Sequence, residues 1–266
     1  MRNFTTRRPG FARIVRNPVS LVLACGFLTG CGASTPASLE KPAAPPTTRQ
    51  RLDAVQRQAS ELNYDGAIAE FEKIRAAEPD AVTALDGLKM VIVYAEIGNM
   101  AKHDELTRWL VERHKTPKTA TDAERSVKGY IVHPSARDKA LIAHAVEMTR
   151  YASEHAARDG EGEYQGFFDT SRGVAAYRAG RFAEASKLLS TTTEHQSLYV
   201  RTLSLPFYAM SERARGNRKM ADTLAERARS TARALPVPGT DEYGVEWTDI
   251  LISRRALEEM ETTLAK

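Results

Sequence analysis

The stretch Tyr64–Pro79, with the sequence YDGAIAEFEKIRAAEP, decides the fold of this chain. Its apolar residues follow one another at steps of one, three and three, a spacing that places them on one face of a helix with 3.6 residues per turn. These residues are Ala67, Ile68, Phe71 and Ile74. The charged residues between them fall on the other sides. The stretch therefore predicts an amphipathic helix that buries one face against a neighbour.

Pro79 ends this helix, because proline has no N–H to donate and its ring clashes with the preceding turn. We expect the next helix to begin directly afterwards, with Asp80 as its N-cap. An aromatic residue, an alanine three residues later, a bulky residue four later and a proline eight later mark one helix of the tetratricopeptide repeat. Tyr64, Ala67, Phe71 and Pro79 match all four positions, so the stretch resembles the second helix of this repeat. The resemblance implies a right-handed stack of helical hairpins.

Two further hairpins repeat the pattern near the C-terminus. Gly173 and Tyr177 precede Gly180, and Gly216 follows 36 residues after Gly180, close to the period of the repeat. The period is lost between residues 116 and 166, although helical spacing continues. We expect an all-α fold, a right-handed α-solenoid of TPR-like hairpins that is degenerate in the middle and ends in a capping helix. The expected helices are 49–62, 65–78, 81–97, 100–115, 121–131, 135–158, 163–179, 182–194, 198–215, 218–234 and 241–264.

A second resemblance covers the C-terminal half, from Glu124 to about Met260. The runs ERSVKGY, YRAGRFAEA, LPFYAMSERARGN and EWTDILISRRAL are similar to the helical repeat region that follows the kinase domain in some bacterial serine/threonine kinases. The chain has no glycine-rich loop, catalytic aspartate motif or metal-binding triplet of a kinase. The resemblance therefore implies the repeat module and carries no catalytic role.

Residues 1–30 predict a lipoprotein signal peptide, with an arginine-rich start, an apolar run from Val19 to Leu28 and small residues at the end. The run LTGC that ends at Cys31 resembles the bacterial lipobox, whose cysteine receives diacylglycerol and becomes the mature N-terminus. The resemblance implies lipid attachment at Cys31, and an ordinary cleaved signal with an incidental cysteine is the alternative. Gly32 replaces the aspartate that is associated with inner-membrane retention, which favours the outer membrane, facing the periplasm.

Residues 31–48 are rich in Pro, Ala and Thr and predict an extended tether, so residues 49–266 remain for the repeat domain. The net charge of +4 comes from the leader. Five of the 38 basic residues lie in residues 1–30, which contain no acid, so the rest has 33 basic against 34 acidic residues and a formal charge of −1. A nearly neutral mature chain lacks the basic face of nucleic-acid-binding proteins.

The common catalytic constellations are absent from the sequence. The six histidines include no His-Glu-x-x-His motif, and there is neither a Gly-x-Ser-x-Gly elbow nor a phosphate loop. His144 and His155 share a face of one expected helix, but Zn²⁺ needs ligands about a turn apart and a third group. Both cysteines precede Gly32, so the folded part has no thiolate chemistry. We expect no catalytic residues, no metal and no cofactor.

The tetratricopeptide resemblance implies a groove, lined by the first helix of each hairpin, that receives a peptide or a helix. The residues expected to face it are Phe167, Tyr177, Arg178, Met210 and Arg213. We therefore expect a non-enzymatic, lipid-anchored envelope scaffold that binds another envelope protein or peptide segment in an assembly or pilotin-type role. The alternative is a membrane-anchored enzyme or a ligand sensor with an unrecognised site in the 116–166 region.

Overall fold

The structure is a computed structural model that describes residues 44–238, 240, 243–244 and 246–266. These residues form an all-helical body without a β-strand. The predicted signal peptide and most of the predicted tether lie outside the described residues. The elements are α1 (Thr48–Ser60), α2 (Tyr64–Ala77), the 3₁₀ helix η1 (Pro79–Ala81), α3 (Ala84–Glu96), α4 (Met100–Arg113), α5 (Ala120–Ile131), α6 (Lys139–His155), the 3₁₀ helix η2 (Gly162–Tyr164), α7 (Gln165–Arg178), α8 (Phe182–Ser190), α9 (Leu198–Ala214), α10 (Arg218–Ala232) and α11 (Trp247–Leu264).

Each of the eleven predicted helices coincides with one α-helix of the structure, so the all-α prediction is confirmed. The differences lie at the ends. Helix α6 begins at Lys139 rather than at residue 135, because the Asp138 carboxylate caps it by accepting hydrogen bonds from the backbone N–H groups of Ala140 (2.9 Å) and Leu141 (3.3 Å). Helix α11 begins at Trp247 rather than at residue 241.

The predicted face of α2 lies in the core, where Ala67, Phe71 and Ile74 are fully buried. The prediction that Asp80 caps the following helix was wrong. Asp80 lies inside η1, and α3 begins only after Thr83. Thr83 and Asp86 form a capping box, in which the Asp86 N–H donates to the Thr83 hydroxyl (3.2 Å) and the Thr83 N–H donates to the Asp86 carboxylate (3.1 Å). This reciprocal pair satisfies two backbone donors, which a cap at Asp80 would leave without partners.

Consecutive helices pack in pairs: α1 with α2, α3 with α4, α5 with α6, α7 with α8, and α9 with α10. The first helices of the pairs also contact one another in chain order, from α1 through α3, α5 and α7 to α9. We call these five helices the first-helix row. Close approach within a pair depends on small residues, because a Cβ on Gly173 of α7 would lie 2.6 Å from Cγ of Leu189 on α8.

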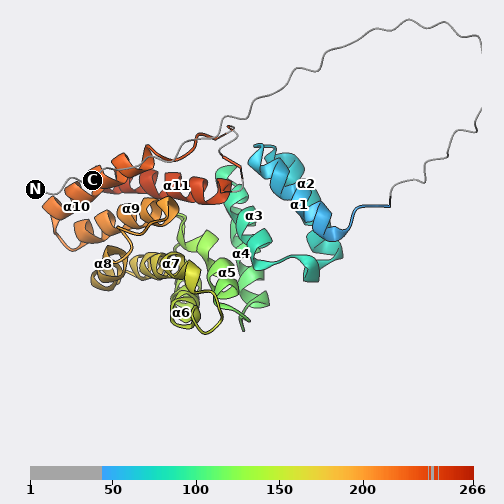
Figure 1. Cartoon of the computed structure of the whole chain (residues 1–266), viewed down its shortest axis with the longest axis horizontal. Coiled ribbons are helices and arrows are strands. Elements are labelled where there is room, and N and C mark those ends of the chain that lie inside the picture. Colours follow the sequence, from blue (N-terminus) through green and yellow to red (C-terminus); the bar gives the residue numbers. More distant parts are fainter. Residues whose placement is uncertain (1–43, 239, 241–242, 245) are drawn as a thin grey trace, which may run out of the picture. The chain divides into compact units, whose positions relative to one another are not determined.

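The last helix, α11, lies against the first-helix row. Figure 1 shows it beside α9 and α10, and it contacts α9, α10 and α3. Its apolar side is in the core, where Trp247, Ile250 and Met260 are at most 1% exposed. Its other side is also used, since Arg255 pairs with Glu96 of α3 (3.0 Å). The predicted capping helix therefore has polar contacts to the rest of the body as well as an apolar face.

Candidate functional site

The five predicted groove residues lie in three places. Tyr177 and Arg178 on α7 and Met210 on α9 come together, with the Tyr177 hydroxyl 3.6 Å from the Met210 sulfur and the Arg178 guanidinium 5.5 Å from the centre of the Tyr177 ring. Phe167 lies in the first turn of α7, whereas Tyr177 and Arg178 are its last two residues. Arg213 is half-buried near the end of α9. The structure thus brings three of the five residues together.

Tyr177, Arg178 and Met210 make contacts with other parts of the same chain. Met210 is 1% exposed. The Arg178 side chain is 6% exposed; its Nε donates to the carbonyl oxygen of Ile131 (2.7 Å) and its Nη2 donates to the carboxylate of Glu259 on α11 (2.6 Å). Helix α11 thus meets the first-helix row at Arg178, which faces protein rather than solvent.

A cavity of about 600 Å³ lies where the first turns of several helices meet, and we call it the helix-end cavity. This volume falls in the range that small-ligand sites occupy. Its wall is built from five helices, α3, α5, α7, α9 and α11, together with Tyr164 of η2. The charged, hydroxyl-bearing and aromatic side chains in this wall include Lys89, Arg125, Phe167, Tyr199, Thr248 and Asp249. Phe167 is the one predicted groove residue in this wall.

One side of the helix-end cavity is a buried charge cluster. The Lys128 ammonium lies 3.2 Å from the Glu124 carboxylate and 3.5 Å from that of Asp249, and its side chain is 7% exposed. The hydroxyl of Ser171 donates to the same Glu124 carboxylate (2.6 Å). The ammonium also lies 5.3 Å from the Phe167 ring centre, within the range of a cation–π contact. Lys128 therefore has its charge balanced inside the protein, which is what a buried cation requires.

The other cationic side of the cavity is not balanced in this way. Within the described part of the chain, neither Lys89 nor Arg125 has a carboxylate oxygen within 4.0 Å. Burial lowers the pKa of the Lys89 ammonium and the charge of Arg125 lowers it further, whereas the carboxylates of Asp86, Asp249 and Glu246 partly offset this. Two cations thus stand near each other at the cavity wall, and each disfavours the charge of the other.

A second cavity, of about 620 Å³, adjoins the first, and we call it the adjoining cavity. The two share lining residues from α3 and α5, including Lys89 and Arg125. The wall of the adjoining cavity contains the capping residue Asp86, whose carboxylate receives two hydrogen bonds of 3.0 Å from the Arg49 guanidinium. We call the two adjoining cavities together the cleft, and Lys89 and Arg125 lie where they meet.

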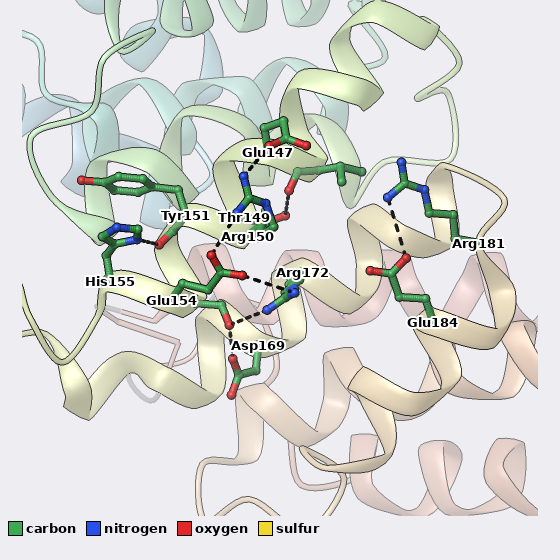
Figure 2. Close-up of polar contacts among 12 residues, drawn as sticks. Glu147, Thr149, Arg150, Tyr151, Glu154, His155, Asp169, Arg172, Arg181 and Glu184 are labelled. Atoms are coloured by element: carbon green, nitrogen blue, oxygen red, sulfur yellow. Dashed lines mark hydrogen bonds and ion pairs between the residues drawn. The ribbon is translucent and has the colours of Figure 1, made fainter.

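The 116–166 segment does not gather its histidines into a site. His155 of α6 stacks on Tyr151 with ring centres 4.1 Å apart, and its Nδ1 lies 2.9 Å from the Tyr151 carbonyl oxygen. Figure 2 shows this pair and places Glu154 between Arg150 and Arg172, with which it forms ion pairs of 3.0 and 3.6 Å. Arg172 belongs to α7, so these contacts join α6 to its neighbour. His144 of α6 takes no part in them, and its buried Nε2 has no hydrogen-bond partner among the described residues.

His133 lines a separate cavity together with Glu96 and Arg255, but that cavity has a volume of about 10 Å³. Such a space holds about one water molecule. In the described ranges, no group of three or more His, Cys, Asp or Glu side chains is placed to hold a metal ion. The segment does contribute Thr121, Arg125 and Tyr164 to the helix-end cavity, so it takes part in a site of another kind.

No protein-family model, no curated protein and no solved structure matches the chain. Among the described helices, none combines the length and the apolar character that crossing a bilayer requires. Cys31, the predicted lipid-attachment residue, lies outside the described residues. Any function assigned to the chain therefore depends on its own sequence and structure.

Sequence reasoning missed Lys89, Arg125 and Thr248. Each stands within the first two turns of its helix, among ordinary charged and polar neighbours, and no local motif marks it. They become a site only because the first-helix row and α11 bring helix beginnings together. The spacing of residues along one helix cannot reveal such a convergence.

Proposed function

We propose that the chain is a non-enzymatic, lipid-anchored scaffold of the bacterial cell envelope that binds another envelope protein. In this proposal its hairpins form a TPR-like, right-handed α-solenoid, and acylated Cys31 holds it at the outer membrane, facing the periplasm. Proposed partners are thus an envelope protein or peptide segment and the lipid bilayer. The lipobox and the tether support the anchor, and the paired helices with their contacts along the first-helix row support the solenoid.

The observation that carries the binding role is the cleft, in which the helix-end cavity and the adjoining cavity lie side by side. Its two parts measure about 600 and 620 Å³ and share charged residues. Peptide-binding sites combine polar groups that orient the segment with apolar walls that bury its side chains, and the lining residues of the cleft include both kinds. We therefore place the binding surface at this cleft, and not at Tyr177, Arg178 and Met210, which already contact other parts of the chain.

Photo-crosslinking in the native cell tests this proposal. A photoreactive phenylalanine analogue replaces Tyr164, which lines the helix-end cavity and is 40% exposed. The matched control replaces Met220 on α10, which is 48% exposed and lies outside both cavities. We expect one envelope protein to be attached at position 164 and absent from the adducts at position 220. No adduct at position 164, or the same adducts at both positions, would contradict the proposal.

A second candidate function is a sensor that binds a small ligand in the helix-end cavity. It is favoured by the volume of about 600 Å³ and by the contribution of Arg125 and Tyr164 from the 116–166 segment. The crosslinking experiment separates the two functions. A sensor whose ligand fills the cavity would give no protein adduct at position 164, while a small molecule would copurify with the chain.

A further inference from the structure

The unbalanced cations of the helix-end cavity face a space that a ligand could fill. Lys89 comes from α3 and Arg125 from α5, and both line the helix-end cavity and the adjoining cavity. Both side chains are half-buried, so water only partly solvates their charges. An anion between them would supply a direct ion pair, which the carboxylates of Asp86, Asp249 and Glu246, all more than 4.0 Å from the Lys89 ammonium, do not give. The contrast with Lys128, which has two carboxylates within 4.0 Å, is the first observation.

A buried hydroxyl without a partner is the second, independent observation. Thr248 in the first turn of α11 is 6% exposed, and among the described residues its Oγ1 has no hydrogen-bond partner. Thr248 lines the helix-end cavity. Its Oγ1 is itself closed off from solvent, so a bound group meets this oxygen only when the Thr248 side chain rotates. Because a buried polar atom without a partner costs free energy, a hydrogen bond gained from a ligand would then be favourable. A hydroxyl can donate to an anionic oxygen.

The backbone around the cavity carries the same sign. The wall is formed by the beginnings of α3, α5, α7, α9 and α11. The first N–H groups of α5 are already bound, since those of Ala120 and Thr121 donate to the carboxylates of Asp159 (3.0 Å) and Glu161 (2.7 Å). None of the described side chains caps α7, α9 or α11, and the free N–H groups at these three helix beginnings give a partial positive charge that favours anions nearby. Leu88 and Phe168 in the same wall offer apolar surface for the remainder of a ligand.

We propose that the helix-end cavity binds a carboxylate attached to an apolar or aromatic body. In this arrangement the carboxylate lies between Lys89 and Arg125, the Thr248 hydroxyl donates to the ligand, and the apolar body packs against the wall. The carboxylate comes either from a free organic acid or from an acidic residue of the bound partner segment. This inference rests on the binding role proposed for the cleft and specifies its chemistry.

Glu246 provides a further test of the proposal. Of the three acids in the cavity wall, Glu124 and Asp249 lie within 4.0 Å of the Lys128 ammonium, whereas Glu246 does not. Glu246 is exposed, but partial desolvation raises the pKa of its carboxyl and the charge of Asp249 raises it further, whereas Lys89 and Lys128 lower it. A bound carboxylate would be repelled by Glu246 as well as attracted by Lys89 and Arg125. Removing the Glu246 charge should therefore strengthen binding, an effect that mere damage to the fold cannot imitate.

Isothermal titration calorimetry of the purified full chain in detergent tests the proposal. The probes are phenylacetate and its neutral amide, phenylacetamide, and then acetyl-Phe-Asp-amide and acetyl-Phe-Asn-amide. We expect each acid to bind and its amide to bind at least tenfold more weakly, because only the acid can make charge-assisted hydrogen bonds. Preference for phenylacetate points to a free acid, and preference for the aspartyl peptide points to a partner segment. Equal affinity of acid and amide, or no binding of either acid, would overturn the proposal.

Variants identify the groups involved. Lys89→Gln and Arg125→Gln should each weaken acid binding about tenfold or more, and Glu246→Gln should strengthen it severalfold. Thr248→Val should weaken binding without lowering the melting temperature, because it removes a hydroxyl that has no partner in the free protein. Lys219→Gln on α10, outside both cavities, should change nothing. If Arg125→Gln and Lys219→Gln bind alike, the proposed site is wrong, and a crosslink at position 164 would show that the scaffold function stands without it.

Discussion

Arg178 at the end of α7 and Glu259 on α11 form a buried, bidentate ion pair, although they are 81 residues apart in the sequence. Their side chains are 6% and 10% exposed. The Arg178 guanidinium also lies 5.1 Å from the ring centre of Phe207 on α9, and its Nε bonds the carbonyl of Ile131 on α5. One side chain thus joins four helices, and it fixes where α11 meets the first-helix row.

Arg178→Met should destabilise the fold by about 3–5 kcal/mol, because it leaves the Glu259 carboxylate buried and unpaired. That loss is a large part of the stability of an ordinary domain, which is about 5–15 kcal/mol. Urea unfolding followed by circular dichroism measures it. The double variant Arg178→Met with Glu259→Leu should recover most of the loss, because no buried charge remains without a partner.

An exposed pair serves as the control for this prediction. Arg150 and Glu147 on α6 approach to 2.7 Å, but their side chains are 48% and 58% exposed (Figure 2). Arg150→Met should therefore cost less than about 1 kcal/mol. Similar losses for Arg150→Met and Arg178→Met would show that Arg178 is not a structural link between helices.

Gly173→Ala should destabilise the chain, although alanine is the better helix former. The exchange would gain up to about 1 kcal/mol of helix propensity, but the added Cβ would lie 2.6 Å from Cγ of Leu189. Overpacking of this kind costs about 1–3 kcal/mol. We expect a net loss in thermal unfolding, whereas Gly162→Ala, where the nearest atom is 3.9 Å away, should leave the melting temperature nearly unchanged. A higher melting temperature for Gly173→Ala would contradict the close approach of α7 and α8.

The helices could be predicted from sequence because their determinants are local. Ala67, Phe71 and Ile74 mark a buried face by spacing alone, and that face is fully buried. Gly98 and Gly180 mark turns, and both have positive φ values, of 72° in each case. The start of α3 was predicted wrongly because Asp80 and Thr83 lie within four residues of each other and both side chains can cap a helix. In the structure Thr83 is the N-cap, as part of a capping box with Asp86.

The candidate site could not be predicted in the same way. Its determinants are contacts between residues far apart in sequence, such as Lys128 with Asp249. The amphipathic pattern of the last helix indicates a buried side and a polar side but not which helices the polar side meets. Arg255 and Glu259 could be read equally well as a solvent-facing surface, although they pair with Glu96 and Arg178.

Cys31→Ala should abolish lipid attachment and release the chain from the membrane. In the proposed anchor Cys31 is the residue that receives the lipid, and alanine has no thiol to be acylated. Growth with a radioactive or alkyne-labelled fatty acid, followed by gel analysis, measures the attachment. Cys25→Ala is the matched control and should keep both the label and the membrane fraction. A labelled Cys31→Ala protein would contradict the proposed anchor.

His133 makes the stability of the body sensitive to mild acid. Its ring centre lies 5.3 Å from that of His103. Burial lowers the pKa of His133 to about 4, and the charges of His103, Arg255 and Arg178 act in the same direction against a smaller opposing effect of Asp104. A histidine in an unfolded chain has a pKa near 6.5. Between these two values the unfolded chain binds a proton that the folded protein does not.

The His133 contribution to the free energy of unfolding should therefore be constant above about pH 7 and decrease as the pH falls from about 6.5 to 4. The contribution of this one group is about 1–2 kcal/mol, because partial exposure of His133 reduces the full effect. His133→Asn keeps a polar atom for the Ser135 hydroxyl, which lies 2.7 Å from Nδ1 in the native protein, but cannot take up the proton. Urea unfolding at pH 7.5, 6, 5 and 4 should give a shallower decrease for the variant than for the native chain. Parallel pH profiles would show that another group is responsible for the acid sensitivity.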